Sequence, residues 1–169
     1  MLIRREQPGD VASVAQVVTA AFAAGPSTPV ETRLLGALRA DPGWLPWASL
    51  VATDAGGEVT GYVVCTRGRV GDVPALGLGP LAVVPRWQRR GVGAALMHAV
   101  LAAADARDEP FVALLGAPAF YSRFGFGPAA ARGVQAPDPA WGAYFQVRPL
   151  TAYRPVEGTF RYAAPFAGL

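Results

Sequence analysis

The pattern of apolar and polar residues in the first part of the chain predicts one strand followed by two helices. Residues 2–5 form a short β-rich run, and two later segments repeat apolar residues at helical spacing. The apolar positions that share a helix face are Val11, Val14, Val18 and Phe22 in the first segment and Leu34, Leu35 and Leu38 in the second. Asp10 stands where it would cap the first helix, and Thr28-Pro-Val-Glu31 has the form of a capping box for the second.

Two β-rich runs, residues 49–53 and 58–66, follow the second helix. They predict an antiparallel hairpin because Asp54 and two glycines separate them. A fourth strand is expected over residues 75–84, but its glycines and Pro80 are poor residues for a regular ladder. We therefore expect this strand to be distorted near Pro80.

A long helix over residues 91–106 and a short apolar strand over residues 111–115 come next. A strand, a helix and a strand joined by a right-handed crossover place the fourth and fifth strands parallel in one sheet. One or two helical turns are expected over residues 119–124. Further strands are expected at residues 133–134, 144–147 and 158–162. No repeat or linker interrupts this order, so we expect a single mixed α/β domain over residues 1–169.

The composition fits such a domain and narrows its chemistry. A chain of 169 residues with 52% hydrophobic residues is sufficient for one core. No apolar run approaches the roughly 18 residues of a membrane span, and Met1-Leu-Ile-Arg-Arg-Glu6 lacks the apolar segment of a secretory signal, so we expect a cytoplasmic protein. The single cysteine, Cys65, and the single histidine, His98, exclude an internal disulfide and a Cys/His zinc site. We expect no metal.

The net charge of +3 comes entirely from arginine, because the sequence contains no lysine. The arginines are scattered except for Arg4-Arg5 and the group Arg86, Arg89 and Arg90. A local anionic ligand explains the second group better than a nucleic-acid groove, so we expect neither nucleic acid nor a membrane as a partner. A nucleic-acid binder stays an alternative, and it predicts an affinity for DNA or RNA that falls steeply with salt.

The segment between the fourth strand and the long helix has the form of an anion site. The first N–H groups of a helix have no partner within it, and the helix dipole adds partial positive charge there. Gly91 and Gly93 let phosphate oxygens approach these amides without an intervening Cβ. The P-loop pattern is absent, and the dinucleotide fingerprint fails because Leu96 stands where its third glycine belongs.

The residues Gln88-Arg-Arg-Gly-Val-Gly93 match the pattern Gln/Arg-x-x-Gly-x-Gly/Ala, and with them the chain resembles the GNAT superfamily of N-acetyltransferases. Leu81-Ala-Val-Val-Pro85 is similar to the end of the family's fourth strand, and Tyr121-Ser-Arg-Phe-Gly-Phe126 to the aromatic pattern of its next crossover. The chain further resembles a bacterial subgroup of predicted acetyltransferases of the YhbS type in Leu78-Gly-Pro-Leu-Ala-Val83, Phe120-Tyr-Ser-Arg-Phe-Gly-Phe126 and Gly158-Thr-Phe-Arg-Tyr162.

This resemblance implies a central mixed, mostly antiparallel sheet of six to seven strands. It implies that the fourth and fifth strands are parallel and splayed, and that helices flank the sheet. It also implies acetyl-CoA as co-substrate, with its pantetheine arm bonded to amides near Leu81, Ala82 and Val83. The residues implied to hold the pyrophosphate are Gln88, Arg89, Arg90, Gly91, Val92, Gly93 and Ala94.

The implied reaction is direct attack of an acceptor amine on the acetyl thioester, beside a backbone amide that polarises the carbonyl. Tyr121 matches the family tyrosine that protonates the departing thiolate, and its ordinary pKa of about 10 suits that task. Some members carry a glutamate base on the fourth strand, whereas residues 75–82 contain no acid. A water relay or a partly neutral amine is our hypothesis for the base. The alternative is a CoA-binding regulatory or structural module without turnover.

The acceptor side of the expected site carries no motif. We expect an amine-bearing small molecule or peptide, bound by the loops at residues 23–28 and 41–47 and by the C-terminal strands. Glu31 could steer a cation from the second helix, but its capping-box position explains it structurally, and we favour that interpretation. A homodimer stays open.

Other residues that could carry chemistry have simpler explanations. His98 lies off the apolar face of its helix, which indicates a solvated or rim position, and Cys65 is expected in the core. Asp72 is most simply a turn residue. The aromatic residues that could line an acceptor pocket are Phe22, Trp44 and Trp47, although core packing is the favoured interpretation for them.

Overall fold

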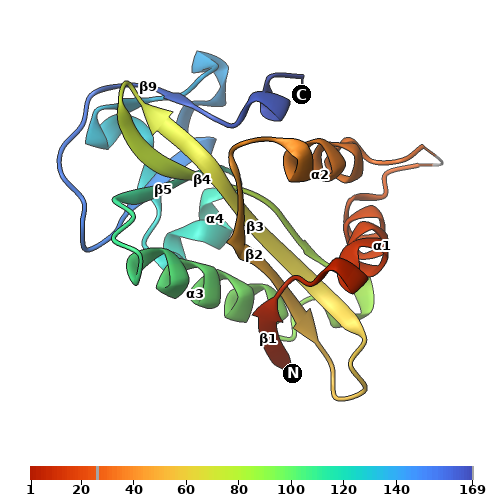
Figure 1. The fold of residues 1–169 in the computed structure, drawn as a ribbon. Helices are drawn as coiled ribbons and strands as arrows, with labels where there is room; N and C mark the ends of the chain where they lie inside the picture. The colour runs from red at the N-terminus through yellow and green to blue at the C-terminus, as the bar shows by residue number, and fades with distance from the viewer. Residues whose placement is uncertain (26, 169) are drawn as a thin grey trace.

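The structure, a computed structural model, describes residues 1–25 and 27–168. Pro26, which belongs to the first expected acceptor loop, and Leu169 lie outside the described residues. The described residues form a sheet of nine strands with helices on both faces (Figure 1). The main path of the sheet is β1 (Leu2–Arg5), β2 (Trp44–Thr53), β3 (Val59–Val70), β4 (Val73–Val83), β5 (Phe111–Leu115), β8 (Phe145–Pro149) and β6 (Gly127–Pro128). Two strands off this path are β7 (Val134–Gln135) and β9 (Gly158–Arg161).

The helices lie between these strands in the expected order. They are α1 (Val11–Phe22), α2 (Val30–Ala40), α3 (Val92–Asp105) and α4 (Pro118–Tyr121). Short 3₁₀ segments cover Pro8–Asp10, Pro85–Trp87, Ser122–Phe124, Ala129–Arg132, Pro139–Tyr144 and Ala164–Gly168.

The sheet confirms the expected fold class. β4 and β5 are parallel, and the other neighbours on the main path are antiparallel. β7 and β9 add a second short parallel pair. β6 was not predicted, because it consists of a glycine and a proline, two residues that are depleted in strands.

Both predicted helix caps are wrong in detail. Pro29 takes the N-cap position of α2 with extended backbone, so the helix begins one residue too late for the capping box and no side chain caps it. Asp10 precedes α1, but its carboxylate turns back to accept hydrogen bonds from the Arg4 guanidinium at 2.6 Å and the Gln7 amide at 2.8 Å. The Arg4 guanidinium lowers the pKa of Asp10.

β2 begins earlier than the pattern indicated. Trp44 already pairs with Thr66 of β3, so most of the expected acceptor loop at residues 41–47 belongs to this strand. A register shift lies between this pair and the regular ladder that starts at Ser49. Because such an irregular start breaks the two-residue alternation, the sequence pattern reveals only the regular part of the strand.

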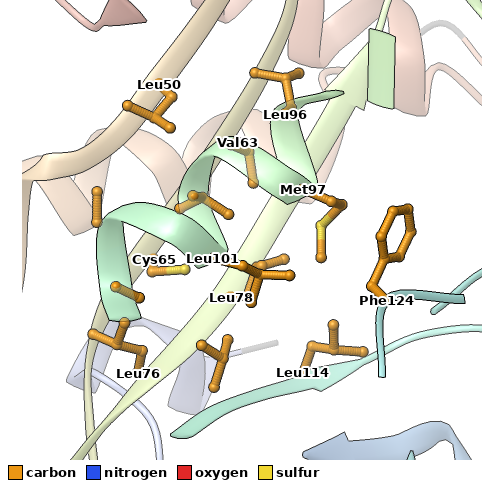
Figure 2. Packing of buried hydrophobic residues seen from close by; sticks show 14 of the residues in the cluster. Leu50, Val63, Cys65, Leu76, Leu78, Leu96, Met97, Leu101, Leu114 and Phe124 are labelled. Carbon is orange, nitrogen blue, oxygen red and sulfur yellow. The ribbon is translucent and has the colours of Figure 1, made fainter. Parts of the chain in front are cut away.

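Helices on opposite faces of the sheet give the core two layers. Successive strand residues point to opposite faces, so Leu50 and Val63 pack beneath α3, whereas Val51 and Val64 pack beneath α1. Figure 2 shows the first layer, where α3 contributes Leu96, Met97 and Leu101. Cys65 is fully buried in this layer, which confirms it as a core residue, and burial raises the pKa of its thiol.

Candidate active site

β4 and β5 separate along their length. The parallel ladder pairs Leu76 with Val112 and Gly77 with Ala113, and it ends there although β4 continues to Val83. The backbone of β4 therefore has no strand partner on its β5 side beyond Gly77, within the part of the chain that the structure describes.

A bulge accompanies this separation. Leu81 pairs with Val63 and Leu78 pairs with Cys65, so β4 has one residue more than β3 between the two pairs. The predicted distortion near Pro80 is thus confirmed. A bulge bends the strand that carries the extra residue, which contributes to the divergence from β5.

The backbone amides of β4 point alternately toward β3 and toward the gap. The Val84 amide donates to the Thr60 carbonyl of β3 at 3.0 Å, and the two-residue period then directs the Ala82 amide toward β3 as well. The amides of Leu81 and Val83 consequently face the gap. Pantetheine was expected to bond to amides near Leu81, Ala82 and Val83. The amide of Ala82 points to β3 instead, and its side chain is buried in the core.

Residues 88–91 form a tight turn that leads from β4 into α3, and residues 92–94 are the first residues of that helix. Arg89 and Gly91 have left-handed backbone conformations, with φ of 59° and 86°. Alternation of this kind turns successive amides toward one side and forms anion-binding concavities. The first helical bond runs from the Ala95 amide to the Gly91 carbonyl, and no described backbone carbonyl accepts from the amides of residues 89–94.

The remaining loop residues fasten it to the sheet. The Gln88 side-chain amide donates to the Val83 carbonyl at 3.0 Å, which holds the loop beside the gap edge of β4. Val92 is the first residue of α3 and buries its side chain in the core layer under that helix, so it can offer a ligand only its backbone. Gly93 and Ala94 are half-buried at the same helix start. The structure thus brings the predicted loop and the end of β4 together.

The three clustered arginines differ in their surroundings. Arg86 forms an ion pair with Glu58 across the exposed surface. The Arg90 guanidinium lies over the Trp87 ring, 5.5 Å from its centroid. Arg89 is exposed and makes no ion pair with another described residue. Arg89 and Arg90 therefore leave their charge available to an anion at the helix start.

Tyr121 is held against the end of β5 by a glycine. A Cβ on Gly116 would overlap the Tyr121 ring, so residue 116 must be glycine for the ring to lie there. Phe120 and Phe126 pack edge-on against the ring, at centroid distances of 4.9 and 5.9 Å. Burial raises the pKa of the Tyr121 hydroxyl, so it is protonated at neutral pH. The sequence motif predicted Tyr121 but not the role of Gly116.

A pocket of about 840 Å³ adjoins the gap. Pro80 and Leu81 of β4 line one side of it, and Gly116 and Tyr121 line the side that follows β5. The aromatic residues that line the pocket are Phe22, Tyr121, Trp141, Phe160, Tyr162 and Phe166. The pocket is therefore largely apolar and is built by both ends of the chain around the gap.

Glu31 lines this pocket instead of capping α2, so the favoured interpretation of this residue was wrong. It is half-buried and forms no ion pair with any described residue. The hydroxyl of its neighbour Thr32 is hydrogen-bonded to the hydroxyl of Thr19 at 3.0 Å, which ties the first turn of α2 to α1. The structure thus turns Glu31 into a candidate binding residue.

The other candidate residues fall into two groups. Phe22, Trp44 and Trp47 all pack against the core layers, as the favoured interpretation held, and Phe22 also lines the pocket. His98 is exposed on α3, which confirms its expected solvated or rim position. Asp72 is exposed in the turn between β3 and β4, which confirms it as a turn residue.

The C-terminal wall of the pocket includes Arg161, Tyr162 and Phe166, which sequence reasoning did not select. This segment was expected only as a strand near the acceptor. The subgroup pattern Gly158-Thr-Phe-Arg-Tyr162 contains Arg161 and Tyr162 but assigns them no role, and no motif marks Phe166. Their place in the wall depends on how the last segment packs against α2.

Two features are absent from residues 1–25 and 27–168. No helix there is long and apolar enough to cross a membrane. No group of three or more His, Cys, Asp or Glu side chains is arranged to hold a metal ion.

Known proteins resemble this chain along almost its whole length. A family model described as the acetyltransferase (GNAT) domain matches residues 46–128. The uncharacterized N-acetyltransferase YhbS of Escherichia coli strain K12 is 34% identical over 172 residues, which cover 98% of both chains.

Two crystal structures extend this similarity to the fold. The GNAT family N-acetyltransferase YhbS from E. coli in complex with CoA has a TM-score of 0.90 and 32% identity, with 98% of this chain and 91% of that chain covered. A GNAT family acetyltransferase from Brucella melitensis in complex with acetyl-CoA has a TM-score of 0.78 and 32% identity, with 98% and 97% covered.

Proposed function

The chain belongs to the GNAT family of acetyltransferases, and on that premise we propose that it transfers the acetyl group of acetyl-CoA to the nitrogen of an amine. The observation that carries the proposal is the gap between β4 and β5, which adjoins the pocket lined by Tyr121. A gap of this kind can admit a thioester arm from one side and an acceptor from the other.

The proposed donor site uses backbone more than side chains. The amide of Val83 would pair with the pantetheine arm as an added strand would, the amide of Leu81 would face the thioester carbonyl, and Ala82 holds β4 to β3. The amides of residues 89–94, with Arg89 and Arg90, would bind the pyrophosphate. The relatives crystallised with CoA and acetyl-CoA support this assignment.

In the proposed reaction the amine nitrogen attacks the thioester carbonyl carbon, so a C–N bond forms and the carbonyl oxygen becomes negative. The Leu81 amide is the first N–H after Pro80, which has none, and it faces the gap where it can stabilise that charge. When the oxygen's electron pair returns, the C–S bond breaks. The thiolate takes the proton of Tyr121, and the resulting phenolate regains a proton released by the nitrogen through water.

The base in this scheme is water that leads to bulk solvent. β4, from Val73 to Val83, contains no aspartate or glutamate that could take the proton directly. The same feature supports a second candidate function, a CoA-binding regulatory module that has the donor site and lacks turnover.

Free CoA release, measured over a panel of amines, separates the two candidates. We expect acetyl-CoA to bind, and CoA to be released only when an amine is present. CoA at about 100 times its Kd should stabilise the fold by about 2.7 kcal/mol, which corresponds to a rise in Tm of about 5–10 °C for a chain of this size.

Arg89→Glu tests the donor loop in the same assays. The reversed charge should weaken acetyl-CoA binding about tenfold or more, because Arg89 is an exposed cation of the loop that makes no ion pair with a described residue. Tight acetyl-CoA binding with no release above background for any amine would favour the regulatory module. Unaltered CoA binding in Arg89→Glu, together with lost DNA or RNA affinity, would instead favour a nucleic-acid binder.

A further inference from the structure

The charge inside the acceptor pocket is set by very few groups. Among the described residues that line it, Glu31 is the acid and Arg161 is the base, and the remaining lining is apolar or neutral. Glu31 and Leu34 are three residues apart in α2, so both lie on the face that covers the pocket. The position of Glu31 is fixed because the Thr19–Thr32 hydrogen bond and the buried side chain of Leu35 hold this helix to the rest of the fold.

Other half-buried and buried acids already have partners. Glu6, Asp10 and Glu109 form ion pairs with Arg39, Arg4 and Arg67. The half-buried carboxylates of Asp41, Asp54 and Asp105 accept hydrogen bonds from backbone amides close to them. Glu31 differs from all of these because it is half-buried at a pocket wall and forms neither an ion pair nor a side-chain hydrogen bond with a described residue. A carboxylate in that position is suited to a cation brought by the ligand.

The rest of the wall indicates what else the ligand carries. Phe22, Trp141 and Phe166 bring aromatic rings to the pocket from three separate parts of the chain. Rings of this kind bury an apolar body and attract a cation through their faces. A volume of about 840 Å³ is large enough for the end of the thioester arm and a body the size of an aryl group together.

We propose that the acceptor is a primary amine on an apolar body of aryl size, and that Glu31 binds its ammonium group before the proton is lost. This inference rests on the proposed acetyl transfer, since it names the substrate class of the same pocket.

Arg161 argues for a different class, an amine that also carries a carboxylate. Arg161 is exposed on β9 and opposite Arg69 in the ladder, where solvent screens its charge. Glu31 is half-buried among apolar groups, where screening is weaker. Glu31 therefore has the larger influence on which acceptor binds.

The test uses the full chain and 2-phenylethylamine as the probe. Spermidine is the hydrophilic competitor, and phenylalanine is the competitor that adds a carboxylate to the same aryl amine. Acceptor kcat and KM are measured from CoA release, and the Kd of each amine is measured on CoA-saturated protein by calorimetry. We expect 2-phenylethylamine to bind more tightly than either competitor. Glu31→Gln should raise its KM and Kd about ten- to a hundredfold, while the Kd of acetyl-CoA changes less than about threefold.

Asp108→Asn is the matched control. It also removes one negative charge, but it lies in the exposed turn after α3, where φ is 56° and asparagine is well tolerated. Asp108→Asn should leave the acceptor constants unchanged, and Glu31→Asp should recover part of the affinity lost in Glu31→Gln.

Two outcomes overturn the inference: a preference for spermidine or phenylalanine, or equal 2-phenylethylamine affinity in Glu31→Gln and the unmodified protein. If 2-phenylethylamine binds in a Glu31-dependent way but no CoA is released, the acetyl transfer is wrong and the binding inference stands.

Discussion

At the scale of single residues, Tyr121 depends on a contact that its own motif does not contain. The aromatic pattern around it predicted the tyrosine, but the ring lies where it does because Gly116 has no Cβ. Gly116 follows β5 and Tyr121 ends the short helix α4, five residues later, so their contact follows from backbone geometry and not from a hydrophobic period. Glu31 shows the same limit, because the pattern suggested a cap and the structure showed a pocket residue.

Tyr121→Phe should lower kcat by about a hundredfold or more and leave the Kd of acetyl-CoA nearly unchanged, because only the proton donor is lost. Burial raises the pKa of Tyr121 above its ordinary value of about 10, so the unmodified protein should lose kcat only when the pH rises beyond that value. That alkaline loss should be missing in the variant. The measurement is kcat as a function of pH, and an equal rate for both proteins at every pH would remove Tyr121 from catalysis.

At the scale of elements, the start of α3 has two roles: it begins a core helix, and its amides form part of the proposed donor site. Gly91 is its N-cap and has a left-handed conformation, so glycine is required by the backbone and not by a packing neighbour. The sequence predicted this helix start well, because glycines, a strand end and a helical period all fall within a few residues. The sequence did not predict the start of α2 correctly: Pro29 is the N-cap and not the first helical residue, so the helix begins one residue later than expected. No apolar residue marks that shift.

Gly91→Ala should destabilise the fold by about 1–2 kcal/mol, because alanine is strained at φ of 86°. It should also weaken CoA binding, since the amides of the loop must rearrange. Gly36→Ala is the control of opposite sign: Gly36 is exposed within α2 with open space around it, so alanine should stabilise the fold by about 0.5–1 kcal/mol. Both values come from denaturant unfolding, with CoA affinity measured by calorimetry. Equal stability of the two variants would contradict the assigned backbone role of Gly91.

At the scale of the whole molecule, the two ends of the chain meet at the acceptor pocket. Leu34 and Leu38 of α2 pack with Ala163 and Phe166 of the C-terminal segment, and Figure 1 shows that segment beside α2. Phe166 also packs against Tyr162, at a ring-centroid distance of 4.8 Å. The proposed donor site, in contrast, is built by β4 and α3, which are adjacent in the sequence.

Phe166→Ala should therefore weaken acceptor binding without affecting donor binding. We expect the acceptor KM to rise about tenfold and the stability to fall by about 1–3 kcal/mol, less than for a fully buried phenylalanine. The Kd of acetyl-CoA should stay the same. Leu2→Ala, on the exposed edge strand β1, is the control and should change neither constant. A change in acetyl-CoA affinity as large as that in acceptor KM would show that donor and acceptor binding are not independent.

The sequence by itself determined the sheet with its parallel β4 and β5, the bulge near Pro80 and the loop before α3. These features depend on residues that lie close together in the chain, where periodicity, glycine and proline act directly on the backbone. Only the tertiary structure decided the direction of each β4 amide, the dependence of Tyr121 on Gly116, and the exposure of Glu31 to the pocket. The first two depend on backbone geometry between neighbouring elements, and the third depends on the packing of α2 against the C-terminal segment. No hydrophobic period encodes any of the three.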